Sequence, residues 1–88
     1  MDAEKPYTPI SCELYDYVEI ACMRGYDVSL GLRDGSSIQG KATTTQTKAT
    51  CEFLVIQIGA EAHPVRLDLI AKLQVLSRPS QFEEIDFG

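Results

Sequence analysis

The side chains best suited to chemistry in this chain are three cysteines and one histidine. Cys12, Cys22 and Cys51 form no close pair, and His63 lies twelve residues beyond the last of them. No CxxC or similar ligand spacing occurs, so we expect no metal and no cofactor. A Cys–His nucleophile would need a third group to orient it, and the sequence indicates none. We therefore expect reduced thiols that pack as small hydrophobic side chains, in a protein that is not an enzyme.

A second candidate is an acidic group near the N-terminus. Glu13, Asp16 and Glu19 are spaced three residues apart, and Tyr15 lies among them. On a helix this spacing keeps the carboxylates on one side of the cylinder. Open, solvated carboxylates keep ordinary pKa values and are poor acids at neutral pH, so catalysis by them is not expected. The group either contacts a basic cleft of a partner or is an ordinary solvated helix face.

The composition is typical of one small globular domain. Of the 88 residues, 44% are hydrophobic and 24% are charged, with a formal net charge of −5. No apolar run approaches the roughly 18 residues of a membrane span, and the acidic start does not resemble a signal peptide, so a cytoplasmic protein is expected. The negative charge disfavours general nucleic-acid binding, which needs clustered Lys and Arg. A charged partner should therefore be basic.

Hydrophobic periodicity predicts a helix over residues 12–24. Ser11 is the expected N-cap, and Gly25 supplies the left-handed residue that ends the helix. Glu13 lies in the first turn, where the helix dipole favours negative charge. The apolar residues that follow the spacing of one helical face are Leu14, Tyr17, Val18, Ala21 and Cys22.

After the helix, alternation with a period of two predicts five short antiparallel strands. Asp34-Gly35 is the expected tight turn between the first two strands. The polar stretch 43–50 has no apolar anchor and is expected to be a loop with frayed strand ends. The fold class is thus mainly β with one helix, a small antiparallel barrel or sheet capped by the N-terminal helix. The expected strands cover about residues 26–33, 36–44, 51–58, 63–69 and 70–77.

The two ends of the chain lack such periodicity. Residues 1–10 contain two prolines and are expected to form an extended arm, and residues 79–88 a loose acidic tail. The single domain then covers residues 11–78. The tail has the charge of a solubilising segment, although Phe82 and Phe87 could dock on a groove.

Several motifs together resemble the Rof (YaeO) family of Rho-binding antiterminators. The resemblance covers about residues 7–72 and implies an Sm-like fold, with a helix over a strongly bent five-stranded barrel. The matching segments, in the family's order, are Pro9-Ile10-Ser11-Cys12-Glu13-Leu14-Tyr15-Asp16-Tyr17-Val18-Glu19-Ile20-Ala21-Cys22, Leu32-Arg33-Asp34-Gly35, Gln39-Gly40-Lys41-Ala42, Glu52-Phe53-Leu54-Val55 and Val65-Arg66-Leu67-Asp68-Leu69-Ile70.

The resemblance also implies a function. Such proteins inhibit the transcription termination factor Rho, a hexameric RNA-dependent ATPase, by binding its N-terminal domain over the primary RNA-binding site. Readthrough of terminators then rises. We expect carboxylates of this chain to stand where RNA phosphates would lie, with no direct binding of nucleic acid. For the chain itself we favour a monomer.

The family motif assigns the contact with Rho to particular positions. Tyr15, Asp16 and Glu19 take the main role, and Glu13 is a peripheral helper. A second family contact lies in the loop after the second strand, where this chain has threonines and one lysine in place of a richer set of polar and basic residues. Tyr17 also stands where the family commonly has a polar residue. The site residues implied by the resemblance are Glu13, Tyr15, Asp16, Glu19, Lys48 and Thr50.

Two other classes of function remain open at this point. An Sm-type RNA-binding module would agree with the fold, but the neutral to acidic surface disfavours it. A thiol-dependent enzyme would require a cysteine whose pKa is lowered.

Overall fold

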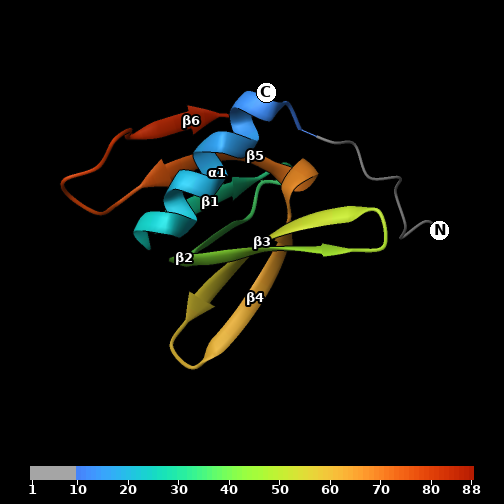
Figure 1. The fold of residues 1–88 in the computed structure, drawn as a ribbon, viewed down its shortest axis with the longest axis horizontal. Helices are drawn as coiled ribbons and strands as arrows, with labels where there is room; N and C mark the ends of the chain where they lie inside the picture. The colour runs from blue at the N-terminus through green and yellow to red at the C-terminus, as the bar shows by residue number, and fades with distance from the viewer. Residues whose placement is uncertain (1–9) are drawn as a thin grey trace.

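One helix and six strands form the part of the chain that the computed structural model describes, residues 10–88 (Figure 1). Nearly all of the expected arm, 1–10, lies outside these residues. No helix among residues 10–88 is long and apolar enough to cross a membrane. The elements in chain order are α1 (Cys12–Arg24), β1 (Asp27–Leu32), β2 (Ser37–Lys48), β3 (Cys51–Ile58), β4 (Glu61–Arg66), the 3-10 turn η1 (Leu67–Leu69), β5 (Ile70–Val75) and β6 (Glu84–Asp86).

The helix α1 has the ends that the sequence indicates. The Ser11 side chain accepts a hydrogen bond from the Leu14 main-chain N–H at 3.2 Å, which satisfies a free donor of the first turn. Gly25 ends the helix with φ at 63°, a conformation that glycine adopts without a steric penalty. Val18 and Ala21 are buried, so this face of α1 packs on the sheet.

The strands form a single antiparallel sheet with the order β4-β3-β2-β1-β5-β6. The strands β2 and β3 approach each other closely at Gly40, where a Cβ atom would lie 2.6 Å from the Ile56 side chain and 2.7 Å from the Gln57 carbonyl oxygen of β3. Only glycine fits this approach. The prediction of a mainly β fold capped by one helix is confirmed, with six strands rather than five.

The expectation of a polar loop over residues 43–50 is wrong, because β2 continues to Lys48. Thr45 pairs with Leu54 and Thr47 with Glu52 in the β2–β3 ladder, and the turn itself needs only residues 49 and 50. Threonine is β-branched and favours strands even without apolar neighbours. The apolar β3 supplies the partner, so hydrogen bonding to β3 decides the conformation of this stretch.

The strand expected over residues 63–69 also differs from the structure. The observed β4 ends at Arg66, and η1 follows over Leu67–Leu69. Leu67 is completely buried while Leu69 is partly exposed. The single turn therefore directs one leucine into the core and redirects the chain into β5.

The C-terminal segment is not the loose tail that its charge suggests. β6 pairs with β5, so that Ile85 lies opposite Leu73. Phe87 is buried, with 6% of its surface exposed. The ring of Phe82 meets Tyr17 of α1 edge to face, with centroids 5.0 Å apart. The two phenylalanines thus join the core, and burial of their rings outweighs the cost of ordering an acidic segment.

Candidate functional site

The carboxylates of Glu13, Asp16 and Glu19 form what we call the acidic flank of α1. All three residues are exposed, and none makes an ion pair within residues 10–88. Elsewhere in this part of the chain acidic side chains do find basic partners, as Asp68 does with Arg66 at 2.7 Å. The structure thus places the three predicted carboxylates on the solvent side of the helix, with no ion-pair partner in the part of the chain that it describes.

Tyr15 occupies a different environment from the carboxylates beside it. Its ring is half-buried against the core, and its hydroxyl donates a hydrogen bond to the Thr45 hydroxyl of β2 at 3.4 Å. Tyr15 therefore ties α1 to β2, and only part of its surface is available to a partner. Helical spacing alone did not separate this residue from the exposed flank.

Lys48 and Thr50 lie apart from the acidic flank, at the turn between β2 and β3. Both are exposed, and the turn projects beyond the body of the sheet (Figure 1). Lys48 is three residues beyond Thr45, a distance of about 10 Å along a strand. The acidic flank lies on α1, which meets β2 at the contact between Tyr15 and Thr45, and Lys48 and Thr50 lie farther along the same strand and its turn.

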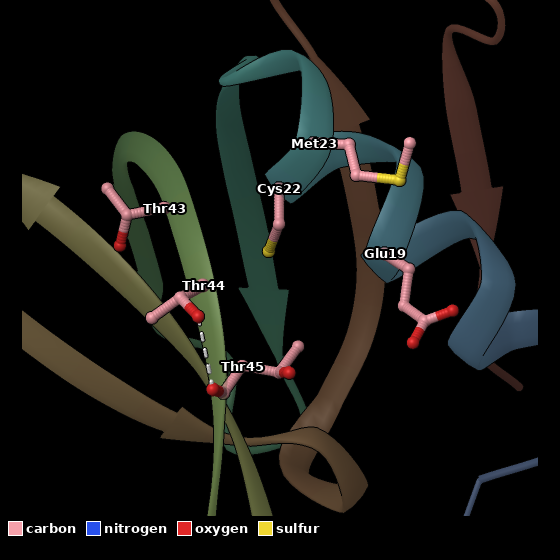
Figure 2. Close-up of a pocket in the computed structure, with 6 residues that line it drawn as sticks. All are labelled: Glu19, Cys22, Met23, Thr43, Thr44 and Thr45. Carbon is pink, nitrogen blue, oxygen red and sulfur yellow. Dashed lines mark hydrogen bonds between the residues drawn. The ribbon is translucent and has the colours of Figure 1, made fainter.

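Between α1 and β2 lies an open pocket of about 350 Å³ that the sequence did not indicate (Figure 2). Glu19 of the acidic flank is on its rim, and Met23 is 81% exposed beside it. The run of threonines that begins at Thr43 is the sequence feature that could have indicated the pocket. Because the stretch is polar, it was expected to be a loop and not part of a site. The lining residues are Glu19, Cys22, Met23, Thr43, Thr44 and Thr45.

The pocket owes its strand side to an irregularity in β2. Ala42 pairs with Ile56 and Thr44 with Val55, so the β2–β3 register leaves Thr43 as an extra residue. Such a bulge redirects side chains and interrupts the alternation of a strand. Three consecutive threonines can therefore line one pocket.

Cys22 points from α1 toward β2 in this pocket (Figure 2). Burial raises the pKa of its thiol to about 11, and the nearby Glu19 carboxylate adds to the increase. A thiol with a raised pKa stays neutral at physiological pH, whereas a nucleophilic cysteine needs a lowered pKa. Cys22 therefore lacks the property that a thiol-dependent enzyme would require.

No group of three or more His, Cys, Asp and Glu side chains within residues 10–88 is arranged to hold a metal ion. The single histidine, His63, lies 3.5 Å from the Glu61 carboxylate at the edge of the sheet.

Known proteins resemble this chain in sequence and in fold. Residues 9–87 match the family model described as modulator of Rho-dependent transcription termination (ROF). Protein rof of Escherichia coli (strain K12) is 38% identical over 64 residues, which are 73% of this chain and 76% of that protein, and protein rof of Shigella flexneri matches equally. The solved structure of YaeO bound to magnesium from Vibrio cholerae O395 superimposes with a TM-score of 0.77 at 28% identity, covering 84% of this chain and 97% of that one.

The family match covers nearly the whole described chain, including α1 with its acidic flank and β6. The rof relatives are similar to this chain in sequence, and the YaeO structure is similar to it in fold. The chain therefore belongs to the ROF family of modulators of Rho-dependent transcription termination.

Proposed function

We propose that this chain inhibits termination by binding the N-terminal domain of Rho and covering its primary RNA-binding site with the acidic flank of α1. Membership of the ROF family makes Rho the partner to consider. A site that holds single-stranded RNA must be basic, with aromatic side chains on which bases stack. The acidic flank has the charge that such a site attracts, and this is the observation that carries the proposal.

The spacing of the flank suits a strand mimic. Each step of three residues advances about 4.5 Å along a helix, so the carboxylates of Glu13 and Glu19 are separated by about 9 Å along the axis. They are held on a folded helix and lose less conformational freedom on binding than a flexible RNA strand would. Lys48 and Thr50 serve as a second, weaker contact at the β2–β3 turn.

The proposed action needs no catalysis by this chain. One copy covers one RNA-binding site as a monomer, in the cytoplasm where Rho meets nascent transcripts, and it competes with RNA without binding RNA itself. The excess of acidic over basic residues in the whole chain, 13 against 8, supports this, because it repels phosphates.

The test reverses the charge of the flank. The double variant Asp16→Lys/Glu19→Lys should lose at least 100-fold in its ability to displace poly-cytidine RNA from Rho, because two attractive charges become repulsive. Displacement is measured by fluorescence anisotropy of labelled RNA at several salt concentrations. Displacement of RNA by the wild-type protein should weaken as the salt concentration rises, because salt screens the charges.

A matched control changes the net charge by the same amount elsewhere. The triple variant Ala60→Lys/Glu61→Lys/Ala62→Lys alters exposed residues at the β3–β4 hairpin, outside the acidic flank and the pocket. It should inhibit Rho within about twofold of the wild type. Inhibition by the double variant at the wild-type level would overturn the proposal, and tight binding of the free chain to RNA would favour an RNA-binding module instead.

A further inference from the structure

We propose that the pocket between α1 and β2 receives an arginine side chain of Rho. This contact is additional to those made by the other two carboxylates of the acidic flank, Glu13 and Asp16. This inference rests on the proposed function, because it takes Rho as the partner. It goes further by naming the residue type that enters and the residues that hold it. Glu19, Met23 and Thr44 take the principal roles.

The Thr43 and Thr44 hydroxyls are available to a ligand as hydrogen-bond acceptors. The Thr43 hydroxyl donates a hydrogen bond to the Val55 carbonyl oxygen at 3.1 Å. The Thr44 hydroxyl donates to the Thr45 carbonyl oxygen at 3.2 Å (Figure 2). A hydroxyl has a single proton and two lone pairs. Both oxygens therefore have lone pairs left to accept and no proton left to donate, so they fit a ligand that is rich in donors.

The charge of the pocket has the same preference. The Glu19 carboxylate on the rim makes no ion pair within residues 10–88. Cys22, the other ionisable group of the pocket, holds its proton, because burial and the Glu19 carboxylate raise its pKa to about 11. A negative charge with no ion-pair partner among residues 10–88, beside neutral acceptors, favours a ligand with a single positive group.

The apolar part of the pocket accommodates an aliphatic stem. Met23 is the most exposed large hydrophobic residue of the described chain, at 81%, and it lies beside the half-buried Cys22. Methionine adapts its shape to an incoming group. Long basic side chains bury their methylene stems while the charged end stays polar, so one such side chain can cover Met23 and reach Glu19.

Arginine fits this set better than lysine. A guanidinium has five N–H donors in a fixed plane and no acceptor, and it is less strongly hydrated than an ammonium. It can bond to the Glu19 carboxylate on one edge and to threonine hydroxyls on another. Lysine would place three donors around a single point and leave acceptors on one wall unused.

The first experiment blocks the pocket without touching the flank. Thr44→Lys puts a positive charge where the arginine would enter and should weaken inhibition of Rho at least tenfold. Thr44→Val removes the hydroxyl, both as an acceptor for the arginine and as the donor to the Thr45 carbonyl oxygen, and should weaken inhibition about fivefold. The matched control is Gln39→Lys, an exposed residue of the same strand outside the pocket. It should remain within twofold of the wild type.

The outcomes separate this inference from the function on which it rests. If Thr44→Lys inhibits like the wild type while Asp16→Lys/Glu19→Lys is inactive, the arginine pocket is wrong and Rho inhibition by the flank stands. If both variants inhibit normally, both proposals fail. Circular dichroism and a urea melt check that Thr44→Lys is folded, and Thr44→Val, nearly the same shape as threonine, gives an answer if it is not.

A second experiment identifies the side chain that enters. Rho alone and Rho saturated with the wild-type protein are treated with phenylglyoxal, which modifies guanidinium groups, or are reductively methylated at lysines, and the modified sites are mapped by mass spectrometry. We expect one Rho arginine to be protected by the wild-type protein and to react again when Rho is saturated with Thr44→Lys. Protection of a lysine that responds to Thr44→Lys in this way, with no such arginine, would overturn the assignment.

Discussion

The helix α1 and the C-terminal segment (residues 79–88) are both acidic. They differ in whether their carboxylates find partners within the chain. The carboxylates of α1 face solvent with no ion pair inside residues 10–88. In the C-terminal segment, Glu84 lies 3.3 Å from the Lys72 ammonium, and the Asp86 carboxylate accepts a hydrogen bond from the Gly88 main-chain N–H at 2.9 Å. The charges of one segment are free for a partner, and those of the other are partly satisfied within the chain.

Main-chain hydrogen bonds and a buried aromatic ring in the C-terminal segment explain this difference. The segment at the C-terminus is anchored by buried Phe87 and by main-chain bonds on both sides of β6, from Val75 to Glu83 at 2.7 Å and from Phe87 to Ala71 at 2.8 Å. On α1 the apolar side is used for packing and the acidic side is left open. We therefore expect changes in the C-terminal segment to lower stability, and changes in the acidic flank to alter binding to Rho.

The largest effect on stability should come from Phe87→Ala. Removing a buried ring leaves a cavity and costs about 3–5 kcal/mol in the free energy of unfolding. Urea denaturation followed by circular dichroism measures this. Met23→Ala, at a residue that is 81% exposed, is the control and should change the free energy by less than about 0.5 kcal/mol. Equal stability of the two variants would show that the C-terminal segment is not part of the core.

A smaller loss is expected for Arg33→Ala. Its guanidinium donates to the main-chain oxygens of Gly88 at 2.7 Å, Asp68 at 2.9 Å and Phe87 at 3.3 Å, and so joins the two residues after β6 to η1. Because Arg33 is largely exposed, we expect a loss of about 1 kcal/mol. Hydrogen exchange should quicken at the Phe87 amide and stay unchanged in α1. Faster exchange in both regions to the same degree would contradict a local role.

Ser11→Ala should act on the other region. Loss of the N-cap hydrogen bond to Leu14 costs about 1 kcal/mol and frays the first turn, which carries Glu13. Inhibition of Rho should fall by a few-fold, measured by displacement of labelled RNA. Ser11→Asp restores an acceptor at the cap and should recover stability. If Asp fails to recover what Ala loses, the cap is not the cause.

The smallest effect on stability belongs to the acidic flank. Asp16→Asn/Glu19→Gln removes two charges from solvent-exposed positions that make no ion pair with any residue from 10 to 88, so the free energy of unfolding should change by less than about 0.5 kcal/mol. The affinity for Rho should fall and become less dependent on salt. A large loss of stability would mean that the flank has a structural role, and the contrast with the C-terminal segment would disappear.

Much of the fold could be read from local patterns. The cap at Ser11, the spacing of apolar residues and Gly25 delimit α1, because helix ends depend on residues within a few positions of each other. Alternation and the Asp34-Gly35 turn indicate β1 and the start of β2 for the same reason. The three carboxylates of the flank were also predictable, since residues three apart on a helix must lie on one side.

Contacts between distant segments decided the rest. Pairing with β3 turns the threonine-rich stretch into strand, a bulge at Thr43 opens the pocket, and Phe82 and Phe87 draw an acidic segment onto the sheet. The sequence alone determined the helix and its exposed charges, because both follow from the spacing of residues three or four positions apart in the chain. Only the tertiary structure decided which acidic residues stay unpaired and where Tyr15 lies, because those outcomes depend on side chains brought together from elsewhere in the chain.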